Sequence, residues 1–344
     1  MLQRLATQAL TLLPPEAAHQ ATIKLLKAPF SPIALSGTSP MLRTELAGME
    51  LPNPIGMAAG FDKNAEVPAP LLSLGFGFVE VGAVTPRPQP GNPAPRVFRL
   101  RKDEAIINRY GFNNDGLEAI GKRLKAQSKR PGIVGINLGA NKDSEDRTED
   151  YVTSLKALEP YVAFLTVNVS SPNTQGLRAL QGKEVLTELL TKVLAARSTD
   201  KPVFVKVAPD LSDEERADIA AAAMEAGVDG MIVSNTTLDR DGLKSADRDE
   251  AGGLSGRPLF EKSTAILRDF ARETEGQLPL IGVGGVFSAA DAFAKIKAGA
   301  TAVQLYTALI YEGPGLIGRM RRTLPNLLKA EGFSSVSEAV GADL

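Results

Sequence analysis

Amide, hydroxyl and lysine side chains follow short apolar runs throughout this chain. In the stretch VNVSSPNTQGLRALQG, a buried strand ends in Asn168, and Ser171 and Asn173 come directly after it. The stretch holds no His, Cys or carboxylate. Because a Ser hydroxyl is a weak base at neutral pH, Ser171 can move a proton only if it is well positioned, desolvated and able to pass its own proton on.

Eight apolar, β-branched runs position these groups. The runs are 54–60, 78–85, 133–139, 164–171, 202–209, 230–236, 279–286 and 302–309. Helical spacing follows most of them, with Ser212 and Glu215 forming a capping box before one helix. Ser288 and Gly299 bound another. Strand–helix alternation repeated eight times predicts a (β/α)₈ TIM barrel over 40–344, with the chemistry at the carboxyl ends of the strands.

Composition excludes several kinds of site. The 344 residues contain no Cys and a single His, at position 19, so a thiolate or His-rich metal site, a cysteine nucleophile and a Ser–His–Asp triad in the main body are excluded. We therefore expect no metal. The net charge of −1 disfavours nucleic acid as a partner. No apolar run is long enough to span a bilayer.

Two segments have more specific meanings. The glycines of the run IGVGG have no side chains, so a backbone can approach a ligand closely there. Together with the end of the eighth strand, this run is typical of a phosphate site; a tight βα turn is the alternative. Between the second and third runs, 97–100 and 105–108 predict a hairpin that carries Asn108 over the barrel mouth.

Residues 1–35 form a separate, helical extension. Leu2, Leu5, Ala9 and Leu12 or Leu13 recur at helical steps, and Pro14 and Pro15 break the chain. A second helix follows, with a stripe of Ala18, Thr22, Leu25 and Leu26. The pair either packs on its own domain or dips an apolar face into a membrane surface.

Nine motifs in register resemble one family. They are AAGFDKNAE, GAVTPRPQPGNP, INRYGFNN, NVSSPNT, VKVAPD, SNTT, GGLSGRPL, IGVGG and VQLYTAL, and they cover nearly the whole chain from about residue 40. The chain resembles dihydroorotate dehydrogenase, a family of FMN-containing barrels that oxidise dihydroorotate to orotate in pyrimidine (UMP) synthesis. The helical extension, and Ser171 where soluble relatives place Cys, resemble the quinone-using, membrane-associated class.

The resemblance implies a role for each matching residue. Ser171 is the expected base. The expected FMN-binding residues are Ala59, Gly60, Ala83, Asn137, Asn168, Lys206, Ser234, Gly256, Gly285, Tyr306 and Thr307. The expected substrate-binding residues are Lys63, Asn108, Arg109, Tyr110, Gly111, Phe112, Asn168, Asn173, Asn235 and Thr236, with the segment Arg109–Phe112 acting through its backbone. Ala83 and Ser234 depart from relatives that carry a hydroxyl residue and Thr there, which predicts altered hydrogen bonds.

The resemblance also implies where the electrons go. We expect a quinone tunnel under the N-terminal helices, with His19 and Arg99 in its lining, and peripheral attachment to the cytoplasmic side of the inner or cytoplasmic membrane. The role of Lys206 stays open: it either faces the flavin or pairs with Asp210. The alternatives to the whole interpretation are another FMN barrel acting on a different planar heterocycle, or a non-redox lyase or isomerase acting on a phosphorylated metabolite.

Overall fold

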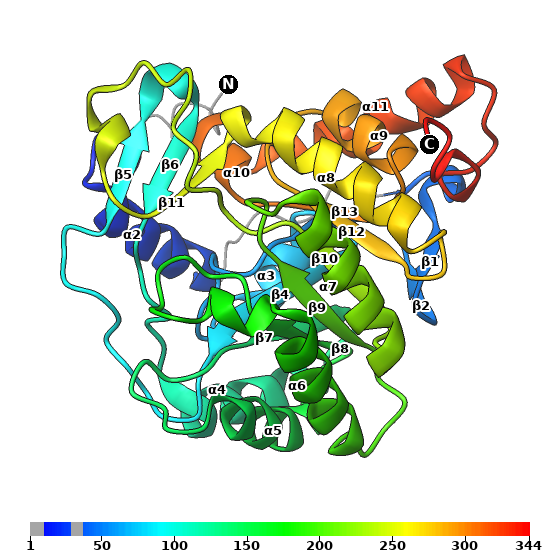
Figure 1. Ribbon diagram of the computed structural model, residues 1–344. Helices are drawn as coiled ribbons and strands as arrows, with labels where there is room; N and C mark the ends of the chain where they lie inside the picture. Colours follow the sequence, from blue (N-terminus) through cyan, green and yellow to red (C-terminus); the bar gives the residue numbers. More distant parts are fainter. Residues whose placement is uncertain (1–9, 29–36) are drawn as a thin grey trace.

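Eight parallel strands close into a barrel in the computed structural model, which describes residues 10–28 and 37–344 (Figure 1). In barrel order the strands are β3 (Ile55–Met57), β4 (Phe78–Val84), β7 (Ile133–Leu138), β8 (Phe164–Asn168), β9 (Val203–Val207), β10 (Gly230–Val233), β12 (Leu280–Val283) and β13 (Ala300–Leu305). Seven of the eight predicted runs contain one of them and the eighth overlaps β13, so the predicted (β/α)₈ barrel is confirmed. The eighth strand starts two residues earlier than its run.

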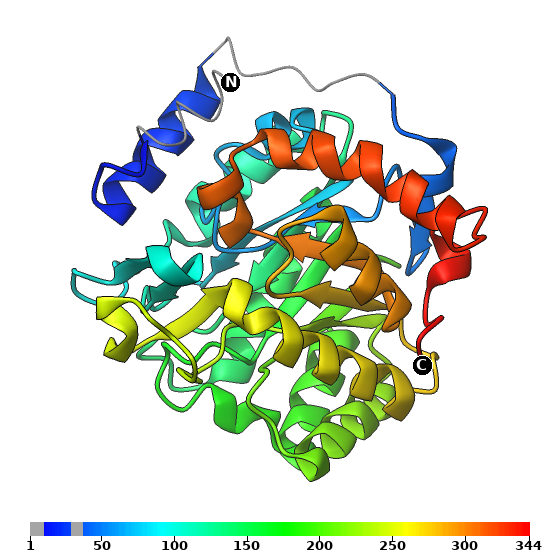
Figure 2. The ribbon, with the colours of Figure 1, turned by 90° about the horizontal axis from the view of Figure 1, so that it is seen from above.

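Helices surround the strands (Figure 2). They are α3 (Pro68–Ser73), α4 (Gly116–Gln127), α5 (Arg147–Leu158), α6 (Lys183–Ala195), α7 (Asp213–Ala226), α8 (Phe260–Glu273), α9 (Ala289–Lys297), α10 (Thr307–Glu312) and α11 (Gly315–Ala330). The predicted capping box of Ser212 and Glu215 is present at α7, and Ser288 caps α9. These local signals place the helix starts correctly because each cap satisfies otherwise unpaired backbone amides.

Three phenylalanines and three glycines fill the amino-terminal end of the barrel. Phe78, Phe164 and Phe204 each lie beside a glycine on the neighbouring strand. A Cβ at Gly135 would come within 2.1 Å of the Phe164 ring, so the glycine makes room for the ring. The hairpin β1 (Thr44–Leu46) and β2 (Met49–Leu51) packs Leu46 and Leu51 into the same cluster. This packed end leaves the opposite end for the chemistry.

The predicted hairpin over the barrel mouth is confirmed as β5 (Val97–Leu100) and β6 (Ala105–Asn108). A third strand that the sequence did not predict, β11 (Gly253–Gly256), pairs antiparallel with β6 and places Gly253 opposite Asn108. The small sheet therefore joins two distant segments, both of which carry residues of the family motifs.

The extension packs beside this sheet as α2 (Pro15–Lys27), which begins at the predicted proline (Figure 1). Most of the predicted first helix, including Leu2, Leu5 and Ala9, lies outside the described residues; at its expected end, Leu12 lies in a turn and Leu13 in a bend. Of the predicted stripe, Ala18 and Leu26 are buried together with Ile23, whereas Leu25 is 61% exposed. The reason is that α2 packs through the face carrying Ile23 and Leu26, which leaves Leu25 at its margin.

Candidate functional site

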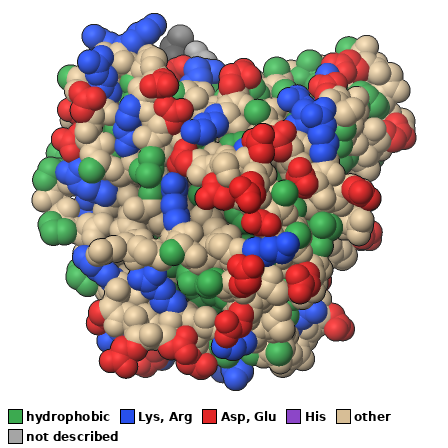
Figure 3. Space-filling model, viewed as in Figure 1, with side chains coloured by type: hydrophobic (Ala, Val, Ile, Leu, Met, Phe, Trp, Pro, Cys, Tyr) green, Lys and Arg blue, Asp and Glu red, His purple; other side chains and the backbone are tan. Residues whose placement is uncertain are grey.

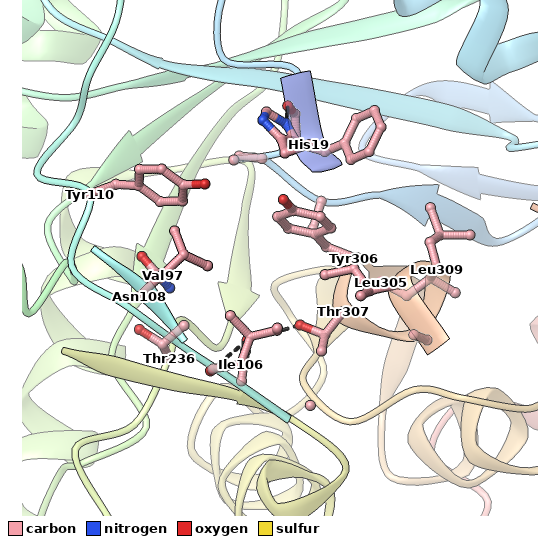
Figure 4. A pocket seen from close by; sticks show the side chains of 18 of the residues that line it. His19, Val97, Ile106, Asn108, Tyr110, Thr236, Leu305, Tyr306, Thr307 and Leu309 are labelled. Atoms are coloured by element: carbon pink, nitrogen blue, oxygen red, sulfur yellow. Dashed lines mark hydrogen bonds between the residues drawn. The ribbon is translucent and has the colours of Figure 1, made fainter. Parts of the chain in front are cut away.

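One cavity of about 510 Å³ lies at the carboxyl ends of the barrel strands and extends to α2. Figure 4 shows His19 of α2 on one side of it, Asn108 and Thr236 on another, and Tyr306 between them. The site residues predicted from the sequence that line it are Ala59, Gly60, Lys63, Ala83, Arg99, Asn108, Tyr110, Gly111, Phe112, Asn137, Asn168, Ser171, Asn173, Lys206, Ser234, Asn235, Thr236, Gly256, Gly285, Tyr306 and Thr307, besides His19. Residues from all eight strand ends and from the extension thus meet in one place.

Arg109 is the one predicted site residue that does not line the cavity. Its guanidinium donates to Glu250 at 2.6 Å and lies 4.5 Å from the centroid of the Phe98 ring. Its amide donates to the carbonyl of Arg96, and its carbonyl accepts from Asn92. Since these partners engage both its side chain and its backbone, Arg109 holds the loop in shape, and its neighbours Tyr110 to Phe112 reach the cavity.

A fully buried carboxylate anchors the amides of the site. Glu80 lies on β4 inside the barrel with no exposed surface, and it accepts hydrogen bonds from Asn137 at 2.7 Å and Gln304 at 2.8 Å. A carboxylate can only accept, so the Asn137 amide must present its NH₂ group to Glu80. Its oxygen then accepts from the NH₂ group of Asn168 at 2.8 Å.

The same polarity continues to the next strand end. The Asn168 oxygen accepts from the hydroxyl of Ser170 at 3.0 Å and from the NH₂ group of Asn235 at 3.4 Å. The Asn235 oxygen accepts from the backbone amide of Thr236. Asn137 and Asn168 each keep a second N–H that donates to none of the described residues, so these amides offer donors to the cavity that they line.

Lys206 is buried beside this chain of amides. Burial lowers the pKa of its ammonium group, and the charge of Glu80 acts in the opposite direction. The alternative pairing with Asp210 is not found: that carboxylate binds Arg178 at 3.0 Å and Lys262 at 2.8 Å instead. In the part of the chain that the structure describes, the Lys206 ammonium has no hydrogen-bond partner, and Lys206 lines the cavity.

Ser171 and Asn173 lie on the loop after β8. The Ser171 hydroxyl accepts from the amide of Asn173 at 3.3 Å, and the Asn173 side chain donates to Asn108 at 3.4 Å. Arg178 holds this loop, donating to the carbonyl oxygens of Ser170 at 3.1 Å and Thr236 at 3.0 Å. A buried hydroxyl is therefore fixed in the cavity wall with its own proton free of any described acceptor.

Lys63 contributes a cation to the cavity that the substrate-binding amides expected from the sequence also line. Its ammonium donates to the carbonyl of Gly60 at 2.8 Å and lies 4.0 Å from the centroid of the Tyr110 ring. Burial lowers its pKa to about 8, so the group is mostly charged at neutral pH. A partly desolvated ammonium of this kind binds a carboxylate well.

The α2 end of the cavity is aromatic and apolar. His19 donates from Nε2 to the carbonyl of Phe61 at 2.7 Å, and burial lowers its pKa to about 4, so it is neutral at physiological pH. The Phe61 ring packs edge-on against both His19 and Tyr306, each at 5.5 Å between centroids. Because a carbonyl oxygen only accepts, Nδ1 of His19 remains an acceptor.

Ion pairs and hydrogen bonds hold α2 over this end. Arg96 binds Glu16 through two nitrogens, at 2.6 and 3.2 Å, and Lys27 binds Glu66 at 2.6 Å. Arg99 donates to the carbonyl of Thr11 at 2.8 Å. The predicted tunnel residues His19 and Arg99 thus come together in the cavity lining, with Arg99 bound to the segment before α2.

A third part of the cavity has the features of a phosphate site. Gly284 and Gly285 follow β12 with φ of +110° and +72°, in the region that favours glycine. The amides of Gly285 and Thr307 donate to no acceptor within residues 10–28 and 37–344. The Thr307 hydroxyl lies 2.8 Å from that of Ser255 on β11. Unpaired amides beside hydroxyls suit an oxyanion.

Comparison with known proteins identifies the family. The family model described as dihydroorotate dehydrogenase matches residues 41–328. The chain belongs to the dihydroorotate dehydrogenase family. A protein of Parvibaculum lavamentivorans named dihydroorotate dehydrogenase (quinone) is 54% identical over 99% of this chain and 98% of its own length. One of Cereibacter sphaeroides with the same name is 55% identical over 99% of this chain and 97% of its own.

A solved structure agrees with this assignment along the chain. The dihydroorotate dehydrogenase of Eimeria tenella in complex with ferulenol is 42% identical and superposes with a TM-score of 0.93, covering 96% of each chain. A family member therefore has the same fold over almost the whole length of the chain.

Sequence reasoning missed three residues that shape the site. The role of Glu80 could have been detected, because it is a carboxylate inside an apolar run and a buried charge needs hydrogen-bond donors around it. Phe61 was visible only as part of a motif, and Arg178 only as one basic residue of a polar loop. Their roles depend on which strand ends become neighbours in the closed barrel.

Replacing Glu80 with Gln tests the anchor. The Gln amide has one oxygen and one NH₂ group, and it presents the NH₂ group to either Asn137 or Gln304. Each of these side chains already points its own NH₂ group at this position, so one of the two loses the oxygen that accepted its hydrogen bond. We expect Glu80→Gln to lower the free energy of unfolding in urea by about 1–3 kcal/mol. The matched control Glu50→Gln, an exposed position on β2, should change it by less than about 0.5 kcal/mol. Equal stabilities of the two variants would show that the carboxylate is not the anchor.

Proposed function

We propose that this chain oxidises (S)-dihydroorotate to orotate with FMN and passes the electrons to a membrane quinone, in the de novo synthesis of UMP. The observation that carries the proposal is the single cavity, which has hydrogen-bonding amides at one end and a neutral, aromatic lining under α2 at the other. A polar substrate and an apolar acceptor then reach one cofactor from two sides.

The cavity fits FMN by the chemistry of its donors. The unpaired amides of Gly285 and Thr307 would hold the phosphate, with Gly256 and Tyr306 beside them. The isoalloxazine edge would take hydrogen bonds from Asn137, Asn168 and the unpaired ammonium of Lys206. Ala59, Gly60, Ala83 and Ser234 would supply the remaining cofactor contacts, as small residues that let the backbone approach closely. FMN, when bound, supplies a two-electron acceptor for hydride.

The substrate end would recognise a cyclic acyl-urea with one carboxylate. Asn108, Asn173 and Asn235 offer both donors and acceptors to ring edges on which these alternate, and Thr236 adds a hydroxyl. Lys63 would bind the carboxylate, since it is the charged group of this wall. The backbone of Tyr110, Gly111 and Phe112 would close the site, while Arg109 acts on the loop from outside.

Ser171 is the base in this proposal. Oxidation removes a proton from one ring carbon and a hydride from its neighbour. The Asn173 amide orients the Ser171 oxygen, and burial keeps bulk water from it. For the hydroxyl to accept the substrate proton, its own proton must leave through a water or a threonine hydroxyl. Lys206 would stabilise the negative charge that builds up on the cofactor.

The α2 end would admit the quinone. His19, Phe61 and Tyr306 line an apolar passage, and Arg99 adds a donor for a quinone oxygen. The Nδ1 atom of His19 is an acceptor available to a hydroquinone hydroxyl, because the ring stays neutral above a pH of about 4. These groups would bind and orient the neutral ring of a quinone better than they would bind a charged, soluble acceptor.

A membrane surface is the proposed location, on the cytoplasmic side of the inner or cytoplasmic membrane. Leu12 is 82% exposed and Leu25 61% exposed, with Lys24 and Lys27 on the same helix near lipid headgroups. Among the described residues, no helix has the length and apolar character to cross a bilayer. Elsewhere, Figure 3 shows Lys and Arg interspersed with Asp and Glu on the face it displays, which gives no support for nucleic acid as a partner.

Two other functions fit the fold less well. Another FMN barrel acting on a different planar heterocycle would need neither the α2 end of the cavity nor the motifs shared with the named relatives. A lyase or isomerase acting on a phosphorylated metabolite would leave Lys206 and the apolar passage without a use. A yellow colour of the purified protein excludes the lyase or isomerase, whereas bleaching of the flavin by dihydroorotate excludes an FMN barrel that acts on a different heterocycle.

Replacing Ser171 with Ala tests the base. The variant loses the hydroxyl but keeps the cavity shape, so we expect the rate of flavin reduction by dihydroorotate to fall roughly 10²- to 10⁴-fold while bound FMN is unchanged. Stopped-flow absorbance under anaerobic conditions measures the rate, and Ser128→Ala at the exposed end of α4 is the control. Reduction at the normal rate in Ser171→Ala would show that the base is another group.

Deleting residues 1–35 tests the quinone end. The truncated chain lacks α2 and with it one wall of the passage, so we expect steady-state quinone reduction to fall by at least roughly tenfold. Flavin reduction by dihydroorotate and turnover with a soluble dye should persist, which controls for misfolding. Quinone turnover equal to that of the full chain would refute the assignment of this end.

A further inference from the structure

A buried lysine without a carboxylate lies behind the proposed phosphate site. Lys295 on α9 has no exposed surface. Its ammonium donates to the hydroxyls of Ser263 at 2.8 Å and Thr264 at 3.0 Å, both on α8, and lies 5.2 Å from the centroid of the Phe260 ring. No carboxylate of residues 10–28 or 37–344 is within ion-pair distance of it; Asp291 and Glu261 act only at longer range.

This arrangement leaves a positive charge under-compensated. Burial lowers the pKa of Lys295 to about 7, because hydroxyl groups replace water poorly around an ammonium ion. Lys262, by contrast, binds the carboxylate of Asp210 directly at 2.8 Å. A buried cation without such a partner is stabilised when a negatively charged group binds near it.

A chain of hydrogen bonds links Lys295 to the cavity. The Ser263 hydroxyl, which accepts from Lys295, donates to the carbonyl of Gly284 at 3.1 Å, and shares its proton with the carbonyl of Phe260. The peptide between Gly284 and Gly285 is trans, so the N–H of Gly285 points away from that carbonyl. This N–H has no described acceptor, and both glycines line the cavity.

We propose that Lys295 is a positioning residue for the cofactor phosphate: its charge, passed through Ser263 and the Gly284–Gly285 peptide, polarises the amide that binds the phosphate and makes the chain prefer FMN to riboflavin. The inference rests on the FMN role proposed above. Hydrogen bonds in such a chain strengthen one another, and the phosphate dianion is the missing counter-charge.

The discriminating readout is the difference between two flavins. FMN and riboflavin share the ring and the ribityl chain, but only FMN carries the phosphate. A lysine that merely fills space between α8 and α9 would affect the affinity for both flavins alike. A lysine that complements the phosphate would affect FMN alone.

Flavin titration of the full-length chain, stripped of cofactor and followed by flavin fluorescence, tests the proposal. We expect Lys295→Met to raise the dissociation constant of FMN roughly ten- to a hundredfold, and that of riboflavin by less than about threefold. The control is Lys297→Met, a lysine on the same helix that binds Glu331 at the surface. Equal weakening of both flavins, or no weakening of FMN, would overturn the proposal.

A second variant covers the case in which Lys295→Met does not fold. Ser263→Ala keeps the lysine but removes the hydroxyl that links it to Gly284. It should weaken FMN binding by roughly three- to tenfold and leave riboflavin binding unchanged; unchanged FMN binding would overturn the linkage. Failure of the unmodified chain to bind FMN would instead contradict the cofactor assignment itself, and with it this inference.

Discussion

A carboxylate buried in the barrel is the constraint on which the site depends. Glu80 has no exposed surface, so amide groups on other barrel strands, Asn137 of β7 and Gln304 of β13, must donate to it. That requirement sets the orientation of Asn137, which sets that of Asn168, which in turn accepts from Asn235. One acid inside the barrel thereby fixes the orientation of Asn137 and Asn168, and each of these two amides keeps an N–H donor for the cavity.

The cavity changes character along its length, and this change suits the two half-reactions that we propose for one cofactor. Amides and the Lys63 ammonium surround the inner part, whereas the rings of His19, Phe61 and Tyr306 line the part under α2. Polar contacts between α2 and the barrel hold the helix over this second part, and Leu12 and Leu25 of the extension are largely exposed. The positive charge of Lys295 behind the glycine loop adds a third, phosphate-directed part.

Sequence patterns predicted what is local or repeated, and missed what depends on long-range pairing. The eight barrel strands were recognisable because buried parallel strands are continuous apolar runs, and Ser212 and Ser288 marked helix starts through local hydrogen bonds. Strand β11 was missed because its four residues, GLSG, carry no β signal and pair with β6 from far along the chain. The exposure of Leu25 depends on how α2 docks, and the side chain of Arg109 turns outward because Glu250 lies there. Family motifs named the site residues, but only the barrel register reveals that Glu80 connects them.

The central claim is that substrate and quinone exchange electrons with one flavin from opposite ends of one cavity. Anaerobic mixing of the purified, yellow protein with dihydroorotate, followed by a second mixing with a short-chain quinone, tests it directly. The account predicts that the flavin absorbance bleaches in the first step and returns in the second, with one orotate formed for each quinone reduced. A flavin that stays oxidised in dihydroorotate, or that bleaches but is not reoxidised by the quinone, would contradict it.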